Sequence, residues 1–342
     1  MTVQPISLTS LKSYHPVLKT QEHIAKAVPV KEIPKASILS SLIKKSETNC
    51  LARALIGSIG LIGFGSSYIL KTLGIELGFD KKIEALQNSF LFRPTQESFP
   101  SPDRLKTNFE EIVLDTPNEP KLHGYFFEKE KSDSVIIYLH GYSGIADECF
   151  PECLKIQEYI PASVLIMDYR GFGKSEGTPT RKGVVTDALR MYNLMKEKGF
   201  KDKNIILYGV SLGGGIAFET ANELRKQKEN IGALVSLYSF SSVKDICNWR
   251  FPHIPSCFVI DDLFNGKNLI RKLNIPVFIA HGDKDLKTPL TQSLRLFKNA
   301  NKPKELYVFP ELGHEDLNPL PKERIEGYFN ALRKFLEKNM FA

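Results

Sequence analysis

The chain has 342 residues, of which 42% are hydrophobic and 25% are charged. This composition excludes a fibrous or wholly disordered chain, and the length fits one α/β domain of roughly 240 to 260 residues with an extension. The net charge is +7, and most of it lies in residues 1–53, which carry eight basic and three acidic side chains. The rest of the chain is nearly balanced, so we expect no nucleic-acid-binding face on the core.

Residues 1–95 form the predicted N-terminal region, a basic arm interrupted by prolines. It contains an uncharged stretch, residues 54–70, with the sequence ALIGSIGLIGFGSSYIL. As a helix this stretch would be about 25 Å long, slightly short of a hydrocarbon core of about 30 Å. Three interpretations compete: a membrane anchor, an interfacial segment or hairpin, and a helix packed on the following domain.

The five cysteines, Cys50, Cys149, Cys153, Cys247 and Cys257, are an odd number and do not resemble a disulfide framework. Cys149 and Cys153 would share one face of a helix, but no second pair of soft ligands stands near them to complete a zinc site. The cysteines therefore indicate inert thiols in a reducing compartment, either cytoplasmic or membrane-associated through the N-terminal region.

From residue 96 onward the pattern is typical of a second region, residues 96–342, built from alternating strands and helices. Residues 110–115 and 122–127 predict a leading pair of strands. Short apolar runs follow, which are typical of strands buried on both faces. These runs cover residues 135–140, 163–169, 204–210, 233–239, 277–282 and 305–310.

The segments between these runs have a helical period of apolar residues. One such face carries Val185, Leu189, Tyr192 and Met195, and the last one carries Ile325, Phe329, Leu332 and Phe335. Alternation of strand and helix predicts a mostly parallel central sheet with helices on both faces.

GVSLG, residues 209–213, follows a predicted strand and opens a predicted helix. This context is typical of a nucleophile elbow, which exposes the serine hydroxyl at the end of a strand. The sequence therefore predicts Ser211 as a catalytic nucleophile. The alternative is a glycine-rich turn with an incidental serine.

A serine hydroxyl needs a neighbouring base, and the base needs an orienting acid. His314 follows the last predicted strand, on the sheet edge where we expect Ser211, and is the predicted base. His140 and His281 stand at strand ends, and we interpret them as structural. Asp283 and Asp285 both follow the preceding strand, and their spacing does not choose between them as the acid; Asp316 is too close in sequence to His314.

Acyl transfer also needs backbone donors for the developing oxyanion. HGYSG, residues 140–144, follows the first long buried strand. We expect the N–H groups of Tyr142 and Leu212 to serve as the oxyanion hole, with the Tyr142 side chain at the mouth of the pocket.

With these residues in place, residues 90–340 resemble the α/β-hydrolase-domain serine hydrolases. This family includes monoacylglycerol-lipase-like enzymes, serine aminopeptidase-like proteins and membrane-anchored acyl-protein and lysophospholipid hydrolases. The resemblance rests on HGYSG, DYRGFGKSEGTPT (168–180), GVSLGGG (209–215), HGDKD (281–285) and GHED (313–316). It implies the α/β-hydrolase fold and selects Asp285 as the acid, three residues after the glycine of HG. The segment LKTP (286–289) departs from the family pattern, and the short insert at residues 240–272 implies no large cap.

These residues predict a serine hydrolase that cleaves a carboxylic ester or thioester through an acyl-enzyme, without a metal or cofactor. The apolar segment 54–70 favours a lipid-derived acyl substrate and membrane contact. The alternatives are a serine peptidase of the aminopeptidase type and a non-catalytic binding protein on the same fold.

Overall fold

A computed structural model describes residues 88, 91–95, 108–250, 262–314 and 322–340. The apolar segment 54–70 and most of the predicted N-terminal region, residues 1–95, lie outside these residues. Within the described part of the chain, no helix combines the length and hydropathy needed to cross a membrane.

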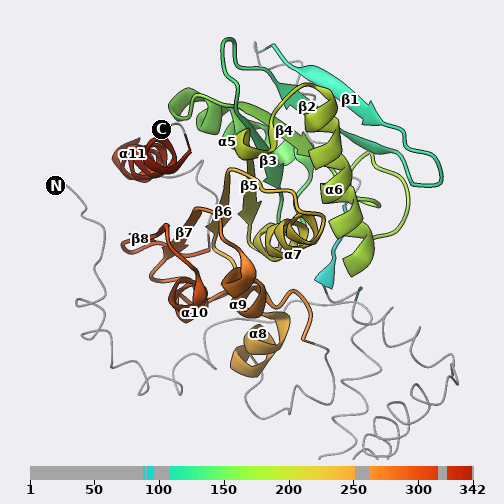
Figure 1. Ribbon diagram of the computed structural model, residues 1–342. Coiled ribbons are helices and arrows are strands. Elements are labelled where there is room, and N and C mark those ends of the chain that lie inside the picture. The colour runs from blue at the N-terminus through green and yellow to red at the C-terminus, as the bar shows by residue number, and fades with distance from the viewer. Residues whose placement is uncertain (1–87, 89–90, 96–107, 251–261, 315–321, 341–342) are drawn as a thin grey trace, which may run out of the picture. The chain divides into compact units, whose positions relative to one another are not determined.

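The described strands form one eight-stranded sheet in the order β1-β2-β4-β3-β5-β6-β7-β8 (Figure 1). The strands are β1 (Glu110–Leu114), β2 (Leu122–Phe127), β3 (Val135–Leu139), β4 (Ser163–Met167), β5 (Ile205–Val210), β6 (Ala233–Leu237), β7 (Val277–Gly282) and β8 (Lys304–Phe309). β2 is antiparallel to β1 and to β4, and the remaining pairs are parallel. The predicted leading strand pair and mostly parallel sheet are confirmed.

The described helices lie between and after these strands. They are α5 (Ala146–Tyr159), α6 (Arg181–Glu197), α7 (Leu212–Lys226), α8 (Val243–Arg250), α9 (Gly266–Leu269), α10 (Thr291–Asn299) and α11 (Lys322–Asn339), with 3-10 turns at Asp202–Asn204 and Ile270–Lys272. Since the carboxyl ends of the parallel strands meet at one edge of the sheet, the loops that follow β3, β5, β7 and β8 converge there.

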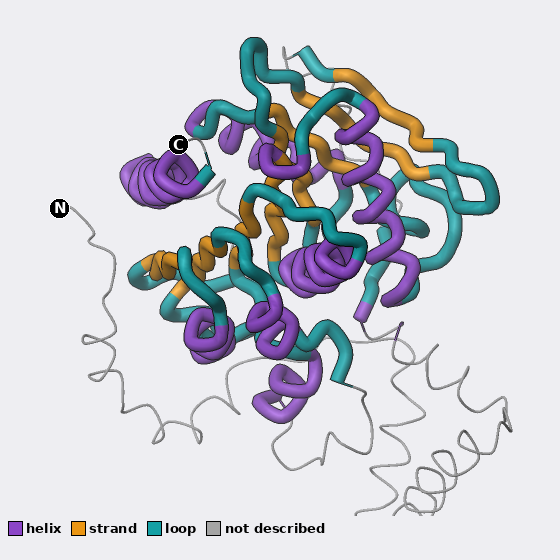
Figure 2. Tube along the Cα trace, viewed as in Figure 1, coloured by secondary structure: helices purple, strands orange, loops and turns teal. Residues whose placement is uncertain are grey.

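Helices cover both faces of the sheet (Figure 2). Ile136 and Tyr138 of β3 belong to a buried core shared with α5 and α11, and Tyr159 of α5 stacks on Phe329 of α11 at 5.0 Å between ring centroids. Side chains alternate along a strand, so the buried Ile137 points to the other face, where α6 and α7 pack against β3.

The predicted inner face of α11 is fully buried. The prediction of the inner face of α6 is only partly correct. α6 begins where Thr180 Oγ1 accepts the Gly183 N–H at 3.0 Å, a normal N-cap. Leu189, which was expected to be buried, is half-buried. The neighbouring Ala188 and Met191 are fully buried, because α6 packs against both the sheet and α7.

Candidate active site

Ser211 occupies the sharp turn between β5 and α7. Its backbone has φ 54° and ψ −112°, in a region that side-chain-bearing residues rarely adopt. Space around the turn is limited: a Cβ on Gly209 would lie only 2.5 Å from Gly213 C, and one on Gly213 would overlap the carbonyl oxygen of Leu139. The two glycines thus allow α7 to start directly after Ser211, as the elbow geometry requires.

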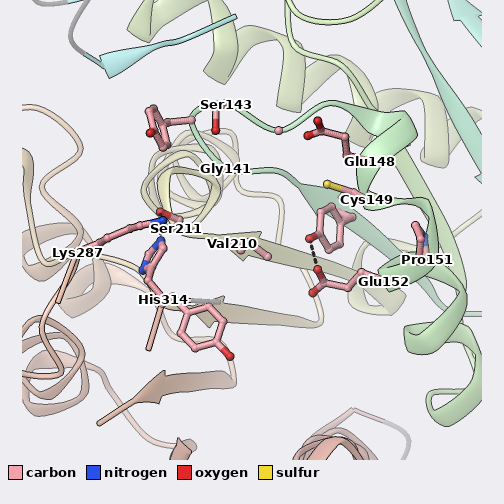
Figure 3. Close-up of a pocket in the computed structure, with 14 residues that line it drawn as sticks. Gly141, Ser143, Glu148, Cys149, Pro151, Glu152, Val210, Ser211, Lys287 and His314 are labelled. Atoms are coloured by element: carbon pink, nitrogen blue, oxygen red, sulfur yellow. Dashed lines mark hydrogen bonds between the residues drawn. The ribbon is translucent and has the colours of Figure 1, made fainter. Parts of the chain in front are cut away.

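The structure brings together Ser211, His314 and Asp285 from three separate loops. His314 Nε2 lies 3.2 Å from Ser211 Oγ, and His314 Nδ1 lies 2.6 Å from Asp285 Oδ2. Figure 3 shows the His314 ring pointing at Ser211. Among the described residues, the carboxylate on His314 is that of Asp285 and not that of Asp283, while Asp316 lies outside the described residues.

The Asp285 carboxylate is buried and fully hydrogen-bonded. Its Oδ1 accepts the N–H groups of Lys287 at 2.8 Å and Thr288 at 2.7 Å, whereas Oδ2 faces the imidazoles of His314 and His281. Burial alone would raise the pKa of Asp285, but the hydrogen bonds from His281 and His314, the charge of His314 and the Thr288 N–H hold it well below its usual value. Asp285 is therefore an anion at neutral pH.

His281 was expected to be only a structural neighbour, yet it contacts the candidate acid. It is fully buried, with Nε2 at 3.2 Å from Asp285 Oδ2 and at 2.5 Å from the Thr288 carbonyl oxygen. Because a carbonyl oxygen can only accept, Nε2 carries a proton, and a neutral ring then accepts from Ser293 Oγ through Nδ1 at 2.7 Å. Because His281 lies on a strand and Asp285 in the loop that follows, their spacing in the sequence gave no signal of this contact.

The loop after β3 lies beside Ser211. A Cβ on Gly141 would stand 3.8 Å from Ser211 Cβ, and Tyr142 and Ser211 line the same cavity. The Tyr142 carbonyl oxygen accepts the Arg93 N–H at 2.9 Å, which ties the loop to the preceding chain. The Tyr142 side chain is 45% exposed at the cavity, and Leu212 is the first residue of α7.

A cavity of about 380 Å³ opens beside Ser211. α5 contributes Glu148, Cys149 and Glu152, which were not anticipated from the sequence and lie across the cavity from Ser211 and His314 (Figure 3). Their spacing along α5 puts them on one helix face, but only the packing of α5 shows that this face meets the cavity. The complete lining is Tyr138, Gly141, Tyr142, Ser143, Gly144, Glu148, Cys149, Pro151, Glu152, Val210, Ser211, Tyr238, Lys287 and His314.

No described group of three or more His, Cys, Asp or Glu side chains is arranged to hold a metal ion. Cys149 is half-buried at the cavity, and Cys153 is buried one helical turn further along α5. Of the described cysteines, Cys153 and Cys247 are buried free thiols.

A family model described as "alpha/beta hydrolase fold" matches residues 134–271. Among curated proteins, the chain is 28% identical over 253 residues to the protein bem46 of Schizosaccharomyces pombe, covering 72% of this chain and 82% of that one. It is also 25% identical over 246 residues to a Saccharomyces cerevisiae protein named an uncharacterized membrane protein, covering 70% of this chain and 84% of that one.

Among solved structures, the chain is similar to the esterase Pf2001 of Pyrococcus furiosus. The TM-score is 0.57 at 20% identity, over 73% of this chain and 98% of the esterase. At this identity the likeness is one of fold. It agrees with the sheet order and helix placement described above.

Proposed function

We propose that this chain, which has the α/β-hydrolase fold and matches the model of that fold over residues 134–271, is a serine hydrolase that cleaves a carboxylic ester or thioester. The observation that carries this proposal is the pair of contacts made by His314, at 3.2 Å to Ser211 Oγ and 2.6 Å to Asp285 Oδ2. In such an arrangement Ser211 is the nucleophile, His314 is the base and Asp285 is the acid that orients the base.

In the first half of the reaction, Ser211 Oγ attacks the acyl carbonyl carbon while His314 Nε2 takes the hydroxyl proton. The carbonyl oxygen becomes an oxyanion, held by the N–H groups of Tyr142 and Leu212 and favoured by the N-terminus of α7. The imidazolium then gives its proton to the leaving oxygen or sulfur, and the acyl group stays on Ser211 as an ester. Asp285 holds the Nδ1–H tautomer of His314 and stabilises its cation.

In the second half, a water molecule replaces the leaving group. His314 takes a proton from the water as the water oxygen attacks the acyl carbon, and the same two N–H groups hold the new oxyanion. The bond from the acyl carbon to Ser211 Oγ then breaks, and His314 returns the proton to Oγ. Free acid and the original enzyme result.

The cavity favours a short or polar acyl group. Its volume of about 380 Å³ is near the lower end of ligand pockets, and its lining includes Glu148, Glu152 and Lys287. We therefore expect butyryl p-nitrophenyl ester to be turned over faster than the palmitoyl ester, and Ser211→Ala to turn over neither. A fluorophosphonate, which labels an activated serine covalently, gives a second test. A folded wild-type protein that hydrolyses no ester and is not labelled by a fluorophosphonate would contradict the proposal and favour a non-catalytic binding protein.

A serine peptidase is the second candidate, because the carboxylates of Glu148 and Glu152 line the cavity and could meet a protonated amine. Aminoacyl p-nitroanilides, compared with their N-acetylated forms, test it. A preference for the free amine that disappears in Glu148→Gln and Glu152→Gln variants would support a peptidase.

We also propose that residues 54–70 bring the protein to a membrane. The uncharged segment and the name of the Saccharomyces cerevisiae relative, an uncharacterized membrane protein, support this proposal. The test is the membrane-bound fraction of the full chain, compared with a Leu61→Lys/Ile62→Lys variant. Equal fractions would contradict it.

A further inference from the structure

The Ser211–Leu212 peptide group is held by a buried side chain from the segment that follows β6. Ser239, which follows β6, donates its hydroxyl to the Ser211 carbonyl oxygen at 2.9 Å, and the Gly214 N–H reaches the same oxygen at 3.1 Å. In a planar trans peptide the C=O and the N–H point in opposite directions. Fixing the carbonyl of Ser211 therefore also fixes the direction of the Leu212 N–H.

The Gly141–Tyr142 peptide group is held in the same way. His140 Nδ1 lies 2.9 Å from the Gly141 carbonyl oxygen, which can only accept, so Nδ1 is the donor. The His140 ring is fully buried and lies 4.1 Å from the Tyr169 ring centroid. Burial lowers the pKa of His140 to about 4 despite this hydrogen bond, so the ring is neutral near pH 7 and keeps its single proton on Nδ1.

We propose that Ser239 and His140 are positioning residues for the oxyanion hole, each aiming one N–H donor by holding the carbonyl at the other end of its peptide group. This inference rests on the proposed function, since it assigns a task within that site. A donor fixed before the reaction needs no reorganisation as charge develops, and a hydrogen bond to the carbonyl also polarises the N–H of the same peptide.

The start of α7 is built around this contact. A Cβ on Gly214 would lie 2.5 Å from Ser239 Oγ and 2.6 Å from its Cβ, and a Cβ on Gly213 would lie 2.8 Å from the His140 carbonyl oxygen. Glycine is less favourable than alanine within a helix. Two consecutive glycines here allow α7 to approach both positioning residues.

Ser239→Ala tests the proposed role of Ser239. We expect kcat for an ester to fall about tenfold with little change in KM and in the melting temperature. The second readout is the ratio of kcat for an ester to kcat for its thionoester, because sulfur accepts hydrogen bonds weakly. Loss of oxyanion alignment lowers this ratio, whereas general damage to the site lowers both rates equally and leaves it unchanged.

Ser236→Ala is the matched control. Ser236 lies on β6 and is equally buried, but its hydroxyl has no hydrogen-bond partner among the described atoms. This variant should keep the wild-type kcat and the wild-type ratio. An unchanged ratio in Ser239→Ala would overturn the role of Ser239.

His140→Asn and His140→Leu test the proposed role of His140. Asparagine Nδ2 can occupy the place of the Nδ1 donor, so His140→Asn should retain most of kcat and of the ester-to-thionoester ratio, whereas His140→Leu should lose both. An asparagine variant that folds but is as impaired as the leucine variant, or a leucine variant with the wild-type ratio, would overturn the role of His140. An inert wild-type protein would overturn the proposed function and this inference together, whereas an active one with unaffected variants overturns only the inference.

Discussion

His281 Nε2 lies 3.2 Å from Asp285 Oδ2, so the carboxylate oxygen that contacts His314 is also bonded by a second imidazole. Both side chains are fully buried. The second imidazole is itself anchored at both nitrogens, by Ser293 Oγ and the Thr288 carbonyl oxygen. The orientation of Asp285 is thus determined by β7 and α10 as well as by His314.

His281→Leu should reduce kcat by about three- to tenfold. The substitution removes one hydrogen bond to a charged group and leaves Ser293 without its acceptor. A three- to tenfold fall in kcat corresponds to a loss of about 0.6 to 1.4 kcal/mol, within the range for a single hydrogen bond. It also removes a contact that lowers the pKa of Asp285, so that pKa should rise. Steady-state kinetics and the melting temperature test this expectation. A kcat equal to that of the wild type would show that His314 and the backbone N–H groups suffice.

Asp285→Asn should reduce kcat by about 10³ to 10⁴. An amide cannot stabilise the His314 cation, and its NH₂ group would favour the wrong imidazole tautomer. The matched control is Asp283→Asn, two residues earlier, because the Asp283 side chain is not bonded to His314 in the described structure. Comparable losses in the two variants would contradict the assignment of the acid to Asp285.

Ser211→Gly should unfold at a higher temperature than the wild type. The φ of 54° at Ser211 costs a side-chain-bearing residue about 1 to 3 kcal/mol, and glycine removes most of this strain. The greater freedom of glycine in the unfolded chain offsets about 0.5 to 1 kcal/mol, which leaves a net gain of about 1 kcal/mol. Calorimetry on Ser211→Ala provides the control, since alanine keeps the Cβ and the strain. Equal melting temperatures for both variants would contradict strain at the elbow.

Asp168 should make the protein more stable in mild acid than at pH 7. Burial raises the pKa of Asp168 to about 7, even though the Ala146 and Lys174 N–H groups lower it, and Asp147 raises it further. The folded state therefore binds a proton between about pH 4 and pH 7 that the unfolded state releases, and stability falls as pH rises through this window. The full effect is at most about 4 kcal/mol.

Asp168→Asn should remove this pH dependence. Denaturant unfolding at pH 5 and pH 7.5 measures it, with the exposed Asp133→Asn as the control. The wild type should lose stability relative to Asp168→Asn between the two pH values, whereas Asp133→Asn should follow the wild type. A constant difference between the wild type and Asp168→Asn would show that the carboxylate stays ionised.

The sequence by itself determined the sheet and the position of the elbow. Buried parallel strands are continuous apolar runs, and each predicted run contains an observed strand to within a few residues. Glycines at 209 and 213 flank Ser211 in the spacing of a nucleophile elbow, and His314 follows the last strand at the edge where parallel strands end. These features depend on short-range patterns that the sequence displays directly.

Only the tertiary structure decided which side chains of the loops meet. Spacing left Asp283 and Asp285 equivalent, because a loop has no period that gives its side chains a direction. The family resemblance selected Asp285, and the fold brings its carboxylate to His314. The contact of Ser239 with the Ser211 carbonyl joins residues 28 positions apart, and Glu152 reaches the cavity only through the packing of α5. Such contacts result from the relative placement of whole elements, which local sequence patterns do not encode.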